Sequence, residues 1–278
     1  MRNANLIVVM LGIAGLALAA ALAWRWRRLA LLADTRTVAD TRGRAALDGL
    51  RTLAVAMAAG VLAGVLVPGL GGRLVMRILG STSHDAQGER TAANEVVGKI
   101  TGDGTIAVVV FVGVLGGVIA ALAFVVVRRW LPTTAGPAGW VAGVLLLGTI
   151  GVSDAMSPDN KDFAILRPTW LAVTLVVALA LLFGVTFTGL AARLDAGMPM
   201  LTARPSSIAS HSALIIYLIP FLLVGAVVYV ALRALLLGRL TAILASARVQ
   251  RVGRVIVGIA TLVATASSFR AIDDIMSA

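Results

Sequence analysis

The chain has 278 residues, of which 59% are hydrophobic and 13% are charged, and its mean hydropathy is +0.98. Soluble domains average about 45–50% apolar and 25% charged residues, so this composition excludes an ordinary soluble domain and indicates that most of the chain lies in lipid. The formal net charge of +11 does not indicate nucleic-acid binding, because the basic residues are dispersed among apolar runs.

The chain contains no cysteine, which excludes disulfides, thiolate metal sites and cysteine nucleophiles. Its two histidines, His84 in a polar loop and His211 at a helix edge, are expected on opposite sides of the membrane, which argues against a bis-histidine haem or metal site. No cofactor is therefore predicted. Only Lys99 and Lys161 are lysines among the basic residues, a bias typical of GC-rich bacterial coding.

Seven apolar runs predict spanning helices, since a helix needs about 18 or more apolar residues to cross a bilayer. The five tryptophans lie at ends of these runs, where the membrane interfaces are expected. The predicted fold class is all-α: a polytopic transmembrane helix bundle of about seven spanning helices with a small extracytoplasmic polar cap. The runs cover about residues 5–24, 52–70, 105–127, 138–154, 170–191, 212–232 and 253–269.

The N-terminal part is predicted to be an anchor. The first run ends in Ala21-Leu22-Ala23 and could be a signal peptide with a small-residue cleavage site, but the basic cluster WRWRR follows at once and favours an uncleaved helix with an outer N-terminus. Apolar and charged residues then alternate at helical spacing. We therefore expect residues 1–51 to form the anchor and a basic cytoplasmic amphipathic segment against anionic headgroups, and residues 52–278 to form the bundle.

The side on which each later loop lies is less well defined by the sequence. Seven crossings place the C-terminus with the cytoplasmic loops and residues 233–254 outside, and the basic residues then divide equally between the two sides. If the fourth run were re-entrant instead of spanning, every later segment would invert and the division would become unequal. We expect seven crossings.

Glycines at four-residue spacing occur in the second, third and fourth runs, as Gly60 and Gly64, Gly113 and Gly117, and Gly139 and Gly143. This spacing puts small residues on one face of a helix and allows another backbone to approach closely. Packing inside the bundle is the expected use, and a subunit interface is the alternative.

The second run meets Pro68-Gly69 and Gly71-Gly72 and is expected to break, then restart as a short helix with Arg73 and Arg77 on one face. A broken helix exposes N–H groups that, beside an arginine, suit an anion such as a lipid phosphate or a carboxylated substrate. The alternative is that both arginines extend to lipid headgroups or pair with loop acids.

Two polar loops, at 71–104 and 155–168, are expected to share the outer side. In the first, Asp103-Gly104 is a turn signal and Thr105 is expected to cap the third helix. Across this polar cap Arg73 and Arg77 would face acidic side chains, with structural pairing as the default and a binding site as the alternative. The candidate acids are Glu95, Asp154, Asp159 and Asp162.

The segments GGRLVMRILGSTS, EVVGKITGDGT, RRWLP and PDNKDFAILRPTWLAV resemble a family of multi-pass membrane proteins from high-GC Gram-positive bacteria. The resemblance covers roughly residues 50–195 and is distinctive in the two polar motifs. The chain departs from the family at ERTAANE, where a Thr closely followed by Glu is more usual, and at Lys161, where proline is commoner. The resemblance implies a shared bundle with outer polar loops and no particular reaction.

The motifs leave three hypotheses for function. Metalloprotease spacing and a phosphate-binding Gly-Lys-Ser/Thr loop are both missing, and no acid lies in the middle of a run. The leading hypothesis is a non-enzymatic integral protein of the bacterial plasma membrane, an accessory or scaffold component that contacts anionic lipid headgroups and a membrane-protein partner or a second copy.

The alternative is a small transporter or lipid-binding protein that takes an anionic headgroup or solute at Arg73 and Arg77. A third hypothesis is an enzyme acting on a lipid-linked substrate with Glu95 or Asp159 as acid or base, which requires both a pocket and a matching pKa.

Overall fold

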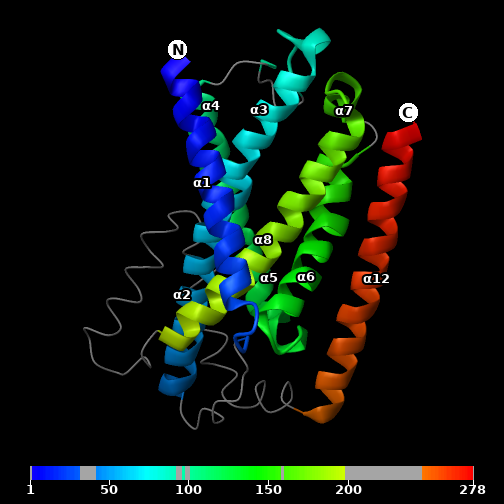
Figure 1. Ribbon diagram of the computed structural model, residues 1–278. Coiled ribbons are helices and arrows are strands. Elements are labelled where there is room, and N and C mark those ends of the chain that lie inside the picture. Colours follow the sequence, from blue (N-terminus) through cyan, green and yellow to red (C-terminus); the bar gives the residue numbers. More distant parts are fainter. Residues whose placement is uncertain are drawn as a thin grey trace.

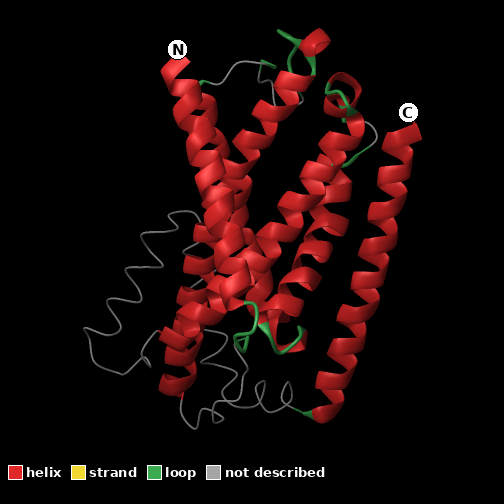
Figure 2. Ribbon diagram, viewed as in Figure 1, coloured by secondary structure: helices red, strands yellow, loops and turns green. Residues whose placement is uncertain are grey.

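The computed structural model describes residues 2–31, 42–91, 96–97, 101–157, 160–197 and 246–277. Within these ranges the chain is helical and forms no strand, with two isolated β-bridges (Figure 2). Five described helices are long and apolar enough to cross a membrane. They are Leu6–Trp26, Leu47–Thr82, Gly102–Trp130, Thr169–Gly197 and Ala247–Ser277.

Several helical segments follow one another without a gap and form longer continuous helices, which we call rods. Three segments, η1, η3 and η5, are π-helical, and η2 and η4 are 3₁₀ turns. In chain order the elements are α1 (Arg2–Trp26), α2 (Arg42–Gly64), η1 (Val65–Gly71), α3 (Gly72–Thr82), η2 (His84–Ala86), α4 (Gly102–Ala107), η3 (Val108–Leu115), α5 (Gly116–Val127), η4 (Arg128–Trp130), α6 (Ala135–Leu146), η5 (Leu147–Ala155), α7 (Lys161–Ile165), α8 (Thr169–Gly197) and α12 (Ala247–Ser277).

The rods run side by side between an upper end and a lower end, named as Figure 1 draws them. The upper end holds the start of α1, the end of α3, α7 and the end of α12. The lower end holds the end of α1, the start of α2, the turn between α5 and α6, the end of α8 and the start of α12 (Figure 1).

The seven expected crossings are not confirmed, and the expected run 212–232 lies outside the described residues. Helix α12 begins at the lower end, where α8 ends, and it finishes at the upper end, where α1 starts (Figure 1). The expected placement of the C-terminus beside the loops that follow α1 and α5 is therefore wrong. The basic start of α12, residues 247–254, lies with those loops instead.

The fourth apolar run passes from one end of the bundle to the other. Helix α6 continues without a break into η5, from the lower to the upper end (Figure 1). Its apolar part, Ala135–Thr149, is shorter than the five helices that are long enough to cross a membrane, so both the spanning and the re-entrant interpretation of this run stay predictions.

Residues 42–51 do not form a separate segment on the membrane surface. They are the first turns of α2, which continues into the second apolar run, whereas residues 32–41 lie outside the described part. Helix α2 therefore crosses the predicted boundary at residue 51 without a break, and Arg51 is buried and packs against α8. The division into an anchor with its basic segment and a bundle stays a prediction.

The second run does not break at Pro68, contrary to the prediction. Helices α2 and α3 are joined through η1, and Gly64, Gly71 and Gly72 all have right-handed helical dihedral angles. Proline removes one backbone donor from a helix, and the wider π-turn accommodates this loss without ending the helix. The N–H groups that a broken helix would offer to an anion are therefore used inside the rod.

The cap of the third rod is Thr101, not Thr105. The Oγ1 atom of Thr101 accepts a hydrogen bond from the Gly104 N–H at 3.1 Å, and the helix begins at Gly102. Asp103 then lies in the first helical turn, where the helix dipole favours an acid. Thr105 is inside α4 and donates to the Thr101 carbonyl at 2.8 Å.

Glycines hold the rods together by direct backbone contact, so the predicted internal packing is confirmed. A Cβ atom added at Gly60 or Gly64 would collide with the carbonyl oxygen of Gly117 or Gly113 on the facing rod. The glycines of α6 make a matching contact with α8, where a Cβ at Gly139 would lie 2.9 Å from the Gly184 carbonyl oxygen. Such close approach is the usual basis of helix association in lipid.

Aromatic and hydroxyl side chains complete the centre of the bundle. The Phe187 ring lies 4.9 Å from the Phe124 ring, edge to face, and 5.9 Å from the Phe183 ring, stacked. The buried hydroxyls of Thr186 and Thr188 donate to the Ala19 carbonyl of α1 and the Ala135 carbonyl of α6, at 3.3 and 2.8 Å. Helix α8 is thereby bonded to both of these neighbours.

The adjacent residues Gly116 and Gly117 provide a matched test of this packing. Gly117→Ala directs a methyl group onto the Gly60 carbonyl, whereas a Cβ at Gly116 meets nothing within 4 Å. We expect Gly117→Ala to lower the free energy of unfolding by about 1–3 kcal/mol, the usual cost of overpacking. Gly116→Ala should leave it unchanged or raise it slightly, because alanine is the better helix former.

The measurement is an unfolding titration of both variants in detergent, followed by circular dichroism. Equal midpoints for the two variants would contradict the glycine contact.

Candidate functional site

The two arginines predicted to bind an anion lie in α3, one turn apart. Arg73 is 2% exposed and its Nη1 donates to the Met76 sulfur at 3.6 Å, whereas Arg77 is half-buried. Helix α3 packs against α1 and α8. Arg73 therefore points into the protein and not toward the headgroups, which corrects the snorkelling alternative for this residue.

The predicted acidic partners are only partly within the described structure. Asp162 is half-buried in α7, where its N–H donates to the Asn160 side chain at 3.0 Å and begins the helix. Asp154 lies in η5, but its side chain is outside the described part, as are Glu95 and Asp159. The pairing of the two arginines with these acids, and with it the polar cap, stays a prediction.

A serine that the sequence did not single out fixes the upper end. The buried Ser83 hydroxyl accepts a hydrogen bond from the Arg167 N–H at 2.7 Å and donates to the Arg167 carbonyl at 3.0 Å. This hydroxyl joins the end of α3 to the segment before α8. Gln87 also donates to the Gly80 carbonyl at 2.8 Å, which satisfies one of the last carbonyls of α3.

A buried ion pair fixes the lower end. The Arg51 guanidinium is 3% exposed and bonds through Nη1 to the Asp195 carboxylate, which is 19% exposed. Its Nη2 donates to the Asp195 carbonyl at 2.7 Å, so one side chain satisfies both a carboxylate and a carbonyl in the last turn of α8. The pair connects α2 to α8 and has a structural role.

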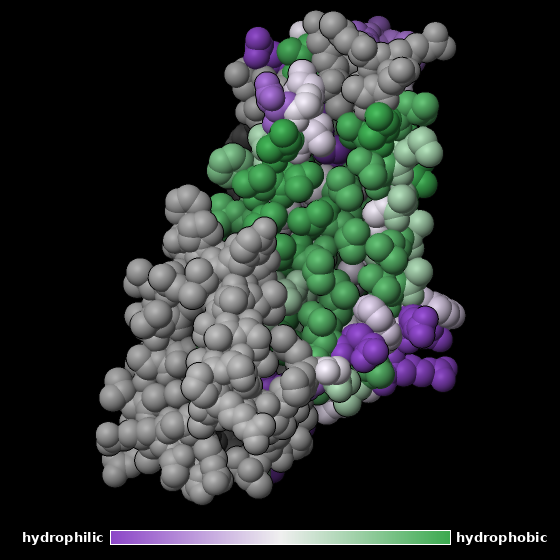
Figure 3. Space-filling view, turned by 90° about the vertical axis from the view of Figure 1, so that its left-hand side faces the viewer, coloured by the Kyte–Doolittle hydropathy of each residue, from purple (hydrophilic) through white to green (hydrophobic). Residues whose placement is uncertain are grey.

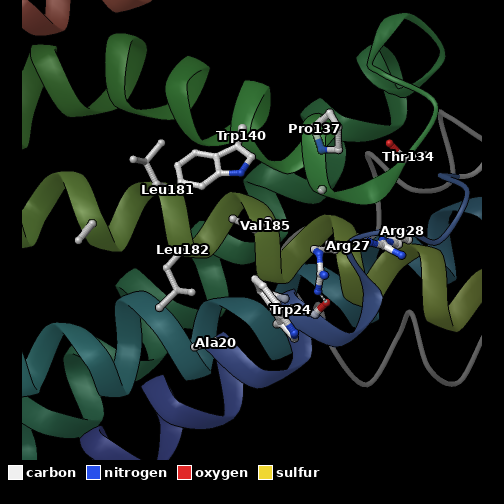
Figure 4. Close-up of a pocket in the computed structure, with 13 residues that line it drawn as sticks. Ala20, Trp24, Arg27, Arg28, Thr134, Pro137, Trp140, Leu181, Leu182 and Val185 are labelled. Carbon is white, nitrogen blue, oxygen red and sulfur yellow. Dashed lines mark hydrogen bonds between the residues drawn. The ribbon is translucent and has the colours of Figure 1, made fainter.

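A cavity of about 820 Å³ lies on the flank of the bundle, between α1, α6 and α8 (Figure 4). Most of its lining is apolar, and its polar side chains gather near one end, toward the lower end of the bundle. The lining residues are Ala20, Ala23, Trp24, Arg27, Arg28, Thr134, Gly136, Pro137, Trp140, Ala178, Leu181, Leu182 and Val185. None of these lining residues is acidic.

The polar end of the cavity is held by backbone pairing. The Ala135 N–H donates to the Leu29 carbonyl at 2.9 Å, and the Gly136 N–H donates to the Arg27 carbonyl at 2.8 Å. The first donors of α6 thus satisfy carbonyls just after α1. A Cβ at Gly136 would lie 2.9 Å from the Arg27 oxygen, so the close approach depends on glycine there.

The Arg27 side chain folds over Trp24. Its guanidinium carbon lies 3.6 Å from the centre of the indole ring, and its Nη1 donates to the Trp24 carbonyl at 2.6 Å. Arg27 is half-buried and Arg28 is exposed. The ring face and the hydrogen bond fix the position of the Arg27 cation, because both interactions act on the same planar group.

These features define the chain as an all-helical protein whose long apolar helices mark it as a membrane protein. Within the described ranges, no three His, Cys, Asp or Glu side chains are grouped so that they could hold a metal ion. No family model, curated protein or solved structure matches the chain. The resemblance of its polar motifs to a bacterial membrane-protein family therefore stays a prediction.

The structural role of the ion pair can be tested at Asp195. Asp195→Asn leaves the Arg51 charge buried without its carboxylate, and we expect the free energy of unfolding to fall by about 3 kcal/mol, the lower end of the range for breaking a buried pair. Arg193→Gln, two residues away on the exposed side of α8, should change it by less than about 0.5 kcal/mol.

Unfolding titrations in detergent compare the two variants with the parent chain. A loss as large in Arg193→Gln as in Asp195→Asn would show that charge at this end matters and the specific pair does not.

Proposed function

We propose that this chain is a multi-pass integral protein of the bacterial plasma membrane that acts as a non-enzymatic scaffold or accessory component of a membrane assembly. The observation that carries the proposal is the packing at the centre of the bundle. Among the described residues, backbone contacts between glycines and packed apolar side chains fill this centre. Each of the following features supports one part of it.

The spacing of charges supports several crossings. Arg51 and Arg73 lie 22 positions apart on one continuous rod with no charged residue between them, a separation of about 33 Å at the rise of an α-helix. The hydrocarbon layer of a bilayer is about 30 Å thick, so the two charges match its limits. Figure 3 shows a hydrophobic band on one face, bounded by hydrophilic groups near both ends.

The distribution of basic residues supports a lower end in the cytoplasm. Among described residues the lower end carries twelve arginines and the upper end six arginines and one lysine, and basic residues favour the cytoplasmic side. The lower-end residues are Arg25, Arg27, Arg28, Arg42, Arg44, Arg51, Arg128, Arg129, Arg193, Arg248, Arg251 and Arg254. The start of α1 would then lie outside, as the sequence predicts.

The closed centre favours a static role over transport. A carrier needs a substrate site near the middle of the bilayer, usually built from interrupted helices or ionisable groups. Here the described centre contains fully buried apolar residues such as Ala63 and Val67, and the hydroxyl of Thr186 is bonded to backbone. The described chain has no acidic or basic residue between Arg51 and Arg73, and none along α8 between Arg167 and Arg193.

The outer helices supply the surface for a partner. Only 17% of the most apolar stretch of α12 is buried, against 67% for the rod that contains α2. Helix α12 contacts its neighbours through small residues, since a Cβ at Gly253 would collide with the Trp130 indole and one at Gly148 with Ala264. Its other side, with Ile259 and Leu262, is exposed along the hydrophobic layer.

Single thiols test the orientation, because the chain has no cysteine of its own. Ser81 is exposed at the upper end and Ser246 at the lower end. In intact cells we expect an impermeant maleimide to label Ser81→Cys and to label Ser246→Cys only after lysis. Labelling in the reverse order would invert the proposed orientation.

Thr186→Cys in the same series tests the closed centre. Thr186 is fully buried, so its thiol should stay unmodified by a small permeant reagent in folded protein and react after denaturation. Reaction in native membranes at the rate of Ser81→Cys would indicate a path through the bundle and would favour transport.

A photo-crosslinking residue at Leu262 tests the scaffold role itself. Leu262 is 72% exposed on α12, whereas Met57 is fully buried and serves as the control position. In native membranes we expect the Leu262 probe to give one discrete protein adduct, to be identified by mass spectrometry, and the Met57 probe to give none. Only lipid adducts at Leu262, with a monomeric protein after mild-detergent purification, would overturn the proposal.

A further inference from the structure

We infer that the cavity between α1, α6 and α8 binds one anionic phospholipid, with the phosphate held by Arg27 and Arg28 and an acyl chain lying along α8. The site requires only that the bundle lies in a membrane, and it is independent of the scaffold role. It also differs from the predicted anion site at Arg73 and Arg77, which lies at the opposite end.

The apolar part of the cavity has the form of a trough that suits an acyl chain. Along α8 its lining runs from Ala178 to Val185, which is about 10 Å at the rise of an α-helix. Its volume of about 820 Å³ lies within the range of about 300–1,000 Å³ that is typical of ligand sites. Figure 4 shows Leu181, Leu182 and Trp140 along this part, away from the arginines.

The polar end of the trough suits a phosphate. Arg27 and Arg28 contribute two positive charges, and no lining residue is acidic, so the end favours an anion. A guanidinium presents paired N–H donors that match phosphate oxygens. The Thr134 side chain lies near the two arginines (Figure 4), and its hydroxyl makes no capping hydrogen bond at the start of α6.

The Arg27 cation is already positioned before a ligand arrives. Its contact with the Trp24 ring and the bond from Nη1 to the Trp24 carbonyl restrict its side chain, and the pairing of Gly136 with Arg27 restricts its backbone. A binding group that is already ordered loses less conformational entropy when the ligand binds.

The depth of the cavity matches the position of a lipid. Trp24 and Trp140 both line it and are both exposed, and tryptophans of this kind lie at the interface between headgroups and acyl chains. The arginines lie just beyond Trp24 along the chain, toward the lower end. A phosphate beside the arginines would therefore have its acyl chain directed into the hydrocarbon layer.

The shape and charge together favour a lipid over other occupants. A soluble anion would use the two arginines and leave the apolar trough empty. A partner helix would bury the charges of Arg27 and Arg28, which is unfavourable because the lining has no carboxylate to neutralise them. A zwitterionic headgroup would bring its own cation close to the arginines, so a headgroup with a net negative charge fits best.

The test is a lipid titration of delipidated protein in a non-ionic detergent, with bound species counted by native mass spectrometry. Phosphatidylglycerol and phosphatidylcholine with identical acyl chains are compared. We expect one phosphatidylglycerol per chain at concentrations at which phosphatidylcholine does not bind. Glycerol phosphate, which has the headgroup chemistry without the acyl chains, should fail to displace it.

Four variants separate specific binding from general charge. Arg27→Gln with Arg28→Gln should weaken phosphatidylglycerol binding by about 30-fold, at roughly fivefold for each basic residue beside an anionic lipid. Arg251→Gln with Arg254→Gln removes the same charge from exposed positions at the same end and should leave binding unchanged. Ala178→Phe fills the trough from an exposed position and should abolish binding with the arginines intact.

Arg28→Gln alone keeps the Arg27 contacts with Trp24, so it remains informative if the double variant does not fold; about a fivefold loss is expected. Equal binding of both lipids, displacement by glycerol phosphate, or an equal loss in the α12 control would overturn the site. If lipid binding fails while the Leu262 probe still gives its protein adduct, only the proposed lipid site is refuted. If lipid binds as expected but the Leu262 probe gives no protein adduct, only the scaffold role is refuted.

Discussion

Contact between glycine backbones is the constraint on which the rest of the bundle depends. Lipid tails are as apolar as the helix surfaces, so burial from water contributes little to helix association, and close packing must replace it. At Gly60, Gly64, Gly113 and Gly117 the absence of Cβ atoms lets two rods meet at their carbonyls. Within the described part of the chain the same contact brings the rods together around buried apolar side chains, so assembly and the packed core have one cause.

The sequence predicted the all-helical, membrane-like character and the glycine faces, because both depend on local patterns, whereas the count of seven crossings is not confirmed. An apolar run and a four-residue glycine spacing are visible without knowing which helix is adjacent. The continuity of the second rod was not visible, since Pro68 and four nearby glycines are local signals for a break. They are overridden by a π-helical segment that is packed between α1 and η3.

The roles of the charged residues were the least predictable. Arg51 is buried against Asp195, Arg27 lies over Trp24 at the mouth of a cavity, and Arg251 is exposed, yet all three lie at the edge of an apolar run in the sequence. What distinguishes them is the group that a distant segment brings close. Asp195 is 144 residues from Arg51, and α6 reaches the turn after α1 from more than one hundred residues away.

The three π-helical segments are places at which a rod can tolerate a change in its length. A π-turn closes its hydrogen bonds one residue later than an α-turn, so it holds an extra residue in the register of the helix. Deleting one residue from Val65–Gly71 would restore α-helical bonding, because the wider turn already absorbs that residue, and the residues beyond it would keep nearly the same orientation. Arg73 would then stay on the buried face although the rod had lost one residue. The same deletion in a purely α-helical stretch of the rod would instead rotate everything beyond it by about 100°. In related chains, single-residue insertions and deletions at these segments are therefore the changes that would leave the upper-end arginines in place, and an alignment scored by substitutions alone would overlook this tolerance.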